Sequence, residues 1–208
     1  VVVDDFEMKI SHVIRGEDHI GNTPKQLFIQ KALKFNTPKY AHLPLILDEK
    51  RAKLSKRFAA VSVDDYRKSG FLPEAFINFI ALLGWHPGGD KEVVPIEAII
   101  KEFSIERVQK AGAVFNVEKL RWMNGEYVKN MDNAELLSRI IDFYKESGND
   151  LEKFSQDQKI KLIALTKERM QTLEGFKDVS SIFYKVGEYL PELLVWKKSN
   201  KESAKNNL

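Results

Sequence analysis

The residues best suited to chemistry form a short basic run, Lys53-Leu54-Ser55-Lys56-Arg57, in which two lysines flank a serine. A lysine ammonium is a compact charge on a flexible stem, so it can follow a polyphosphate as negative charge builds up during a reaction. Ser55 adds a small hydroxyl donor between the two cations. We interpret this run as a site for the phosphates of ATP. The alternative is a basic loop that faces water.

Arg15 is a second candidate, because it ends an apolar run directly before Gly16. A guanidinium at the end of a strand can hold a carboxylate through two parallel hydrogen bonds. The alternative is a surface ion pair with Glu17 or Asp18.

Several segments, taken in order, resemble bacterial glutamyl-tRNA synthetases, which are class I aminoacyl-tRNA synthetases. The basic run stands where that family has its KMSKS-type loop. The resemblance is dense up to about residue 130, and it rests on the segments 13–19, 22–26, 42–47, 53–57, 70–75, 82–85 and 115–125, with 167–173 beyond them.

The resemblance implies that the parent enzyme activates glutamate with ATP to glutamyl-adenylate and transfers it to the 3′ end of tRNA-Glu. Mg²⁺ would accompany ATP and be held mainly through the phosphate oxygens. The segment His19-Ile20-Gly21-Asn22 matches the family's "HIGH" signature only by chance. We therefore assign His19 no catalytic role. The roles implied for other residues are catalysis by Lys53, Ser55 and Lys56, glutamate binding by Arg15, and ATP binding by Asp18, His42, Leu45, Ile46, Lys53, Lys56 and Arg57.

The family also uses its helical region to contact tRNA, which here means tRNA-Glu and possibly tRNA-Gln as well. Cations on the expected helices are the candidate phosphate contacts, although helices commonly display such charges to water. These candidates are Lys119, Arg121, Lys129, Lys167 and Arg169.

The composition is that of a soluble globular protein, with 43% hydrophobic and 30% charged residues among 208. No apolar run is long enough to cross a bilayer, so we expect no membrane contact. We also expect a cytoplasmic location and a monomer. Cysteine is absent and the four histidines lack a zinc spacing, so we expect no structural zinc and no protein metal site. Residues 1–62 carry 11 Lys and Arg against 7 Asp and Glu, which concentrates positive charge around the basic run.

The first 61 residues predict an α/β arrangement that ends in a ligand loop. Val1–Val3 and Met8–Ile14 read as strands, and Ala41–Leu47 as a further buried strand. Between them Thr23 is expected to cap a helix whose first turn holds Pro24. We therefore predict the C-terminal part of a Rossmann-type class I catalytic core, with its site beyond the strand ends.

From Ser62 onward the pattern is mainly helical. Helix starts are predicted at Ser62, Pro73, Pro95, Asn116 and Asp132. Gly70 is expected to end the first of these helices, and Gly84 to provide a left-handed exit from the second. Apolar residues at helical spacing are expected to form the core, among them Ile80, Ile99, Ile100 and Phe103. We divide the chain into a catalytic part (1–61), a helical stem-contact region (62–147) and the start of a helical anticodon-binding domain (148–208).

Because the chain opens inside an expected strand without a methionine, we interpret it as a fragment that lacks the first half of the catalytic domain. Alone, such a fragment should be inactive. Two alternatives stay open: the truncated paralogue that glutamylates a queuosine base on tRNA-Asp, and a non-catalytic tRNA-binding module. A glutaminyl-tRNA synthetase matches the Arg15–Gln26 stretch less well.

Overall fold

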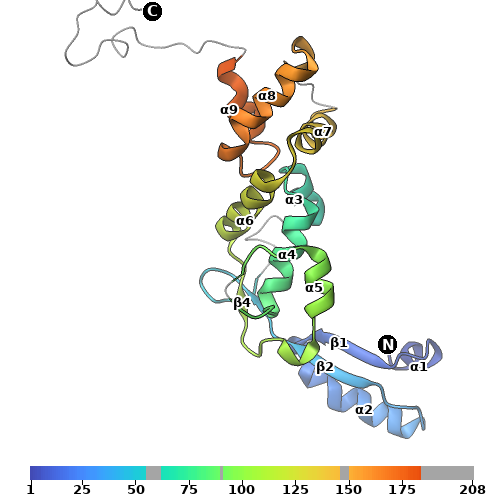
Figure 1. The fold of residues 1–208 in the computed structure, drawn as a ribbon. Helices are drawn as coiled ribbons and strands as arrows, with labels where there is room; N and C mark the ends of the chain where they lie inside the picture. The colour runs from blue at the N-terminus through green and yellow to red at the C-terminus, as the bar shows by residue number, and fades with distance from the viewer. Residues whose placement is uncertain (55–61, 90, 146–149, 184–208) are drawn as a thin grey trace, which may run out of the picture.

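The computed structural model describes residues 1–54, 62–89, 91–145 and 150–183, and the molecule is elongated, with two parallel strands at one end (Figure 1). Helices follow one another toward the other end. The predicted α/β remnant followed by a mainly helical region is confirmed.

The first part of the chain is a β-α-β unit preceded by a short helix. A parallel pair needs a crossover, and α2 supplies it between β1 and β2. Arg15 is the register partner of His42, and Gly16 that of Leu43, so both strands end at the same edge. The elements are α1 (Val2–Glu7), β1 (His12–Gly16), the 3₁₀ segment η1 (Glu17–Asn22), α2 (Thr23–Ala32) and β2 (Lys39–Leu43).

The expected strand at Val1–Val3 is wrong, because this segment leads into helix α1. Val1 and Val3 are exposed, so they do not form a buried strand. Asp4 and Asp5 lie in the first turn of α1, where negative charge favours a helix. The strand preference of three β-branched residues depends on neighbours that this segment lacks.

The single strand expected at Ala41–Leu47 is also wrong. β2 ends at Leu43, and a separate short strand β3 (Ile46–Leu47) pairs in parallel with β4 (Ala113–Val114). Pro44 lies between the two and has no N–H to donate to a ladder. The chain therefore changes its pairing partner at this proline.

The helical part begins largely where its polar residues predict. Ser62 forms a capping box with Asp65, Asn116 accepts from the amide of Lys119, and Asp132 accepts from those of Ala134 and Glu135. The elements are α3 (Val63–Lys68), α4 (Pro73–Gly84), α5 (Ile96–Glu102), η2 (Ile105–Arg107), α6 (Val117–Asn130), α7 (Asn133–Phe143), η3 (Asp150–Lys153), α8 (Gln156–Thr166), η4 (Lys167–Arg169), α9 (Phe176–Ser180) and η5 (Ser181–Phe183).

Two details of the helical prediction are corrected. The chain leaves α3 just before Gly70, as predicted, and Gly70 has a φ of 76°. The left-handed exit predicted at Gly84 is wrong, because Gly84 is the last residue of α4 and the chain leaves in an extended conformation at Trp85. Ile80, Ile100 and Phe103 are exposed rather than in the core, because the short helices α4 and α5 bury only part of their apolar surface.

The core lies in the helical part, since every buried hydrophobic side chain of the described residues is at or beyond Tyr66. Its largest cluster contains Leu72 and Val128 together with Leu151 and Phe176, so it spans the domain boundary that we predict at residue 148. That division stays a prediction. Within the described part of the chain, none of the helices has the length and apolarity needed to cross a membrane.

Candidate active site

Four of the residues predicted to bind substrates gather at the carboxyl edge of the β1–β2 pair. Arg15 and His42 lie near the ends of the two strands, and Asp18 follows β1 in η1. Lys53 reaches this edge from the segment after β3, with its Nζ 2.8 Å from Asp18 Oδ2. Ligands of open α/β sheets bind beyond the carboxyl ends of the strands, so the position suits a substrate site.

Arg15 is fixed by side chains from β2 and α2. Its Nη2 donates to Thr23 Oγ1 at 2.9 Å and to Gln26 Oε1 at 2.8 Å, and its Nε lies 3.4 Å from His42 Nε2. The guanidinium carbon is 5.2 Å from the ring centre of Tyr40. The surface ion pair with Glu17 or Asp18 is not among the ion pairs of the described residues. Arg15 is therefore held in one place by neutral partners.

Thr23 does not cap α2 as predicted. It is the first residue of the helix, and its Oγ1 accepts from Arg15 and lies 3.0 Å from His42 Nε2. The hydroxyl is thus engaged in the cluster around Arg15 instead of with helical amides.

Thr23, Gln26 and Tyr40 were missed as site residues. Thr23 and Gln26 are three positions apart, which places both on one face of α2, and this spacing was the available signal. Tyr40 also accepts from Gln30 Nε2 at 3.0 Å. Gln30 is almost fully buried, so this hydrogen bond restrains the Tyr40 ring beside Arg15.

Asp18 and Lys53 form an ion pair between the strand end and the start of the basic run. The hydrogen bond from Lys53 is the main reason that the pKa of the Asp18 carboxyl lies below its usual value. Predictions for Ser55, Lys56 and Arg57 fall outside the described residues.

The segment expected around adenine is tied to the same edge. The amide of Leu45 donates to Glu17 Oε1 at 3.0 Å. Ile46 is paired with Ala113 in the β3–β4 ladder, and its carbonyl accepts from the amide of Leu54 at 2.9 Å. The backbone of Leu45 and Ile46 is therefore engaged within the protein in this structure.

Three of the five candidate tRNA contacts line one groove. Arg121 and Lys129 on α6 and Arg169 in η4 border a cavity of about 340 Å³, together with the half-exposed ring of Trp122. Glu126, Glu168 and Asp178 line the same groove, so its charge is mixed.

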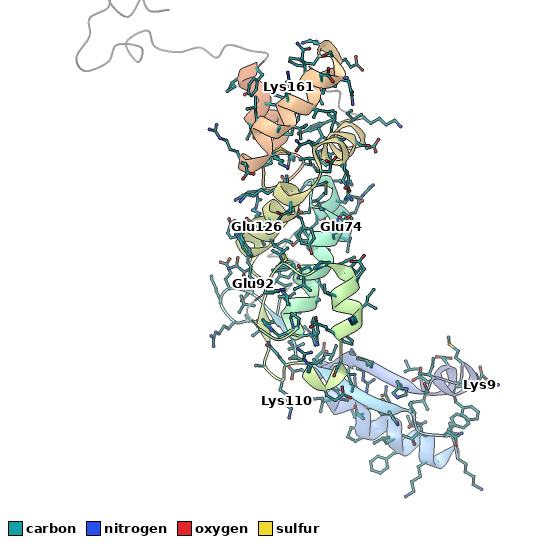
Figure 2. The ribbon with its side chains drawn as sticks, viewed as in Figure 1. Lys9, Glu74, Glu92, Lys110, Glu126 and Lys161 are labelled. Atoms are coloured by element: carbon teal, nitrogen blue, oxygen red, sulfur yellow. The ribbon has the colours of Figure 1, made fainter. Side chains whose placement is uncertain are left out.

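Several of these cations have partners within the chain. Outside the groove, Lys119 pairs with Glu92 at 2.5 Å, and within it Lys129 pairs with Glu126 at 2.8 Å. In the view of Figure 2, these two glutamates lie toward one edge of the helical part and Glu74 toward the other. Lys167 donates to the carbonyl of Met131 at 3.2 Å.

A second cavity lies away from these residues. It has a volume of about 730 Å³ and is bordered by α1 and by the residues that precede β1 and β2, at the amino ends of the strands. None of the predicted site residues lines it. The described residues contain no cluster of three or more His, Asp or Glu side chains suited to a metal ion.

Comparison with known proteins assigns the chain to a family. The family model of class I tRNA synthetases (E and Q), catalytic domain, matches residues 1–122. The chain belongs to this synthetase family. It is 43% identical to glutamate–tRNA ligase 2 of Caldicellulosiruptor saccharolyticus over 88% of the chain, and 49% identical to the glutamate–tRNA ligase of Thermodesulfovibrio yellowstonii over 84%.

A crystal structure of a glutamate tRNA ligase from Elizabethkingia meningosepticum, in complex with its amino acid, superposes with a TM-score of 0.81 at 34% identity. That match covers 95% of this synthetase chain and 43% of the other. The chain spans 38% of the length of each of the two curated relatives named above. The resemblance to glutamyl-tRNA synthetases is thus confirmed.

Proposed function

We propose that the full-length protein containing this chain is a glutamate–tRNA ligase. It would activate glutamate with ATP and transfer the glutamyl group to the 3′ end of tRNA-Glu. The observation that carries the proposal is that Arg15, Asp18, His42 and Lys53 meet at one strand edge. The names of the curated relatives support the same activity.

Arg15 is the proposed glutamate ligand. Its hydrogen bonds to His42, Thr23 and Gln26 use Nε and Nη2, and Nη1 has no hydrogen-bond partner within the described residues. Nη1 can therefore donate to a carboxylate of the substrate while the other nitrogens hold the guanidinium still. Replacing Arg15 by Lys should raise the KM for glutamate far more than the KM for ATP, and an equal rise in both would indicate structural damage instead.

Activation joins a carboxylate oxygen of glutamate to the α-phosphorus of ATP. The bond from that phosphorus to the bridging oxygen breaks, and the electron pair leaves with pyrophosphate. Lys53 and Lys56, with Ser55 and Arg57, would stabilise the charge that develops on the phosphates. Asp18 is proposed to lie near the ribose, and His42 with the backbone of Leu45 and Ile46 near the adenine.

Mg²⁺ would enter with ATP and neutralise its phosphates. The described residues offer no cluster of carboxylates for a protein cage, and Asp18 at the site is already paired with Lys53. The ion would accordingly be held mainly by phosphate oxygens.

The helical region is proposed to bind tRNA-Glu, and possibly tRNA-Gln, through phosphate contacts. The groove that contains Arg121, Lys129 and Arg169 is the favoured place, with Lys119 and Lys167 as further candidates. The division at residues 61 and 147, a cytoplasmic location and a monomeric state belong to this proposal. The chain alone is expected to be inactive.

The deciding experiment is charging of purified tRNA-Glu and tRNA-Asp with labelled glutamate by the full-length protein, with Lys56→Ala as the matched variant. We expect label on tRNA-Glu from the wild type and a steep loss with Lys56→Ala. Label on tRNA-Asp alone would indicate the queuosine-modifying paralogue. Label on neither would leave a tRNA-binding module without chemistry.

A further inference from the structure

Lys53 leaves β3 from a tight turn whose backbone is fixed by local hydrogen bonds. The Asp48 amide donates to the Ala52 carbonyl at 2.8 Å, and Asp48 Oδ1 accepts from the amides of Lys50 and Ala52, each at 2.9 Å. Leu47 and Lys53 then form an antiparallel bridge. The position from which the Lys53 side chain extends is therefore set by β3.

Gly16 leaves room for the Asp18 carboxylate on the other side of the contact. A Cβ atom on Gly16 would lie 2.6 Å from Asp18 Oδ1, so a larger residue there would make the carboxylate shift. The neighbouring Glu17 also holds the chain between β2 and β3 by accepting from the amide of Leu45.

These two placements bring Asp18 and Lys53 to 2.8 Å from each other. The side chains keep 39% and 60% of their surface exposed, so a solute can reach the pair. While the pair persists, Asp18 occupies one of the three N–H donors of Lys53 and places a negative charge where incoming phosphates would approach.

We propose that Asp18 is an internal competitor for Lys53, a positioning residue that holds the lysine at the strand edge until phosphates displace the carboxylate. This inference rests on the proposed function, in which Lys53 contacts the phosphates of ATP. It differs from the ribose role expected from the family, because a competitor weakens phosphate binding whereas a ribose ligand strengthens nucleotide binding. A ligand can shift such an equilibrium only through its different affinity for the paired and released forms.

Binding of inorganic tripolyphosphate to the full-length protein, measured by calorimetry, tests the competition. Tripolyphosphate has no ribose, so a contact between Asp18 and the sugar cannot contribute. Asp18→Asn should tighten its binding by about twofold to fivefold, the range expected for loss of an exposed ion pair. In a Lys53→Met background, the same Asp18→Asn change should have no effect on tripolyphosphate binding. Without the ammonium, the carboxylate and the phosphates no longer compete for one cation.

Glu49→Gln is the matched control, since it removes one negative charge from the turn that precedes Lys53. An equal gain from Glu49→Gln would show a general charge effect and overturn the inference. So would unchanged or weaker binding with Asp18→Asn, a gain that persists without Lys53, or a wild type that does not bind tripolyphosphate. The same wild-type preparation is also tested for charging of tRNA-Glu. If it charges tRNA-Glu but one of these binding results is found, the inference fails while the proposed function stands; if it does not charge tRNA-Glu, the proposed function fails.

Discussion

Arg15 and His42 are register partners across the parallel pair β1–β2, and Arg15 Nε lies 3.4 Å from His42 Nε2. Thr23 Oγ1 approaches the same imidazole nitrogen at 3.0 Å and accepts from Arg15 Nη2 at 2.9 Å. The strand register and the start of α2 thus fix the direction of one guanidinium.

Gln26→Leu removes the acceptor for one N–H of Arg15 and leaves an apolar side chain that suits a helix. Hydrogen bonds to charged groups contribute about 1.5–3 kcal/mol, so we expect the KM for glutamate to rise about tenfold or more. The KM for ATP should change little. Steady-state pyrophosphate exchange measures both constants.

Lys31→Ala is the control for this change, because it alters an exposed residue in the last turn of the same helix. It should leave both constants unchanged. If Gln26→Leu raised both constants equally, the effect would come from disruption of α2 rather than from Arg15.

Gly70→Ala should destabilise the helical part by about 3 kcal/mol. Gly70 has a φ of 76°, and a Cβ atom there would lie 2.5 Å from the amide nitrogen of Glu174. The added methyl would also disturb the hydrogen bond from the Leu173 amide to the Gly70 carbonyl, which is 2.9 Å long. Urea denaturation followed by circular dichroism measures the loss.

Gly89→Ala separates backbone strain from the clash. Gly89 has a φ of 70°, but a Cβ atom there would meet no atom of the described residues within 4 Å. Its cost should therefore be only about 1–2 kcal/mol. Equal losses at the two positions would contradict the close packing of residues 173–174 on Gly70.

Asn124→Ala should cost about 2–4 kcal/mol of stability, because it leaves two backbone groups without their partner. Asn124 is fully buried on α6, where Oδ1 accepts from the Leu72 amide at 2.7 Å and Nδ2 donates to the Gln171 carbonyl at 2.5 Å. Asn130→Ala, at an exposed position of the same helix, should cost well under 1 kcal/mol. Comparable losses from the two variants in urea denaturation would rule out the bridging role of Asn124.

The sequence predicts the helical part well because its signals are local. Ser62, Asn116 and Asp132 each accept from amides two or three residues ahead. The residues that determine where a helix starts therefore lie within one turn of each other. The pairing of Ile46 with Ala113 joins residues far apart in the chain. The short apolar run that contains Ile46 carries no signal of which distant segment it pairs with. The same lack of a local signal explains the error at Val1–Val3.

The candidate site is predicted unevenly for a similar reason. Arg15 and Lys53 are conspicuous as cations in distinctive segments, and the structure brings both to one edge. The contact of Lys53 with Asp18 depends on how the segment after β3 returns toward η1, which spacing does not reveal. The local sequence predicts Thr23 as a cap because capping is a usual role of threonine, but its hydroxyl instead contacts Arg15 and His42 from β1 and β2.

The ion pair between Glu74 on α4 and Arg139 on α7 should make stability depend on pH. Arg139 Nη1 and Nη2 donate to the two carboxylate oxygens at 3.1 and 2.8 Å. Partial burial raises the pKa of Glu74, but the hydrogen bonds from Arg139 and the backbone, with the charge of Arg139, outweigh it and the net pKa is lowered. The unfolded chain therefore takes up this proton at a higher pH than the folded protein.

It follows that the contribution of the Glu74 carboxylate is complete above its ordinary pKa of 4.5 and is lost as the pH falls through the lower folded value. Because both side chains are about one-third exposed, solvent screening limits the contribution to about 1 kcal/mol at neutral pH. Glu74→Gln should be destabilising by that amount near neutrality, and its difference from the wild type should shrink in acid. Urea midpoints over a pH series measure this difference. In an Arg139→Met background the difference should be small at every pH, and a pH-dependent difference that survived there would assign the effect to another partner.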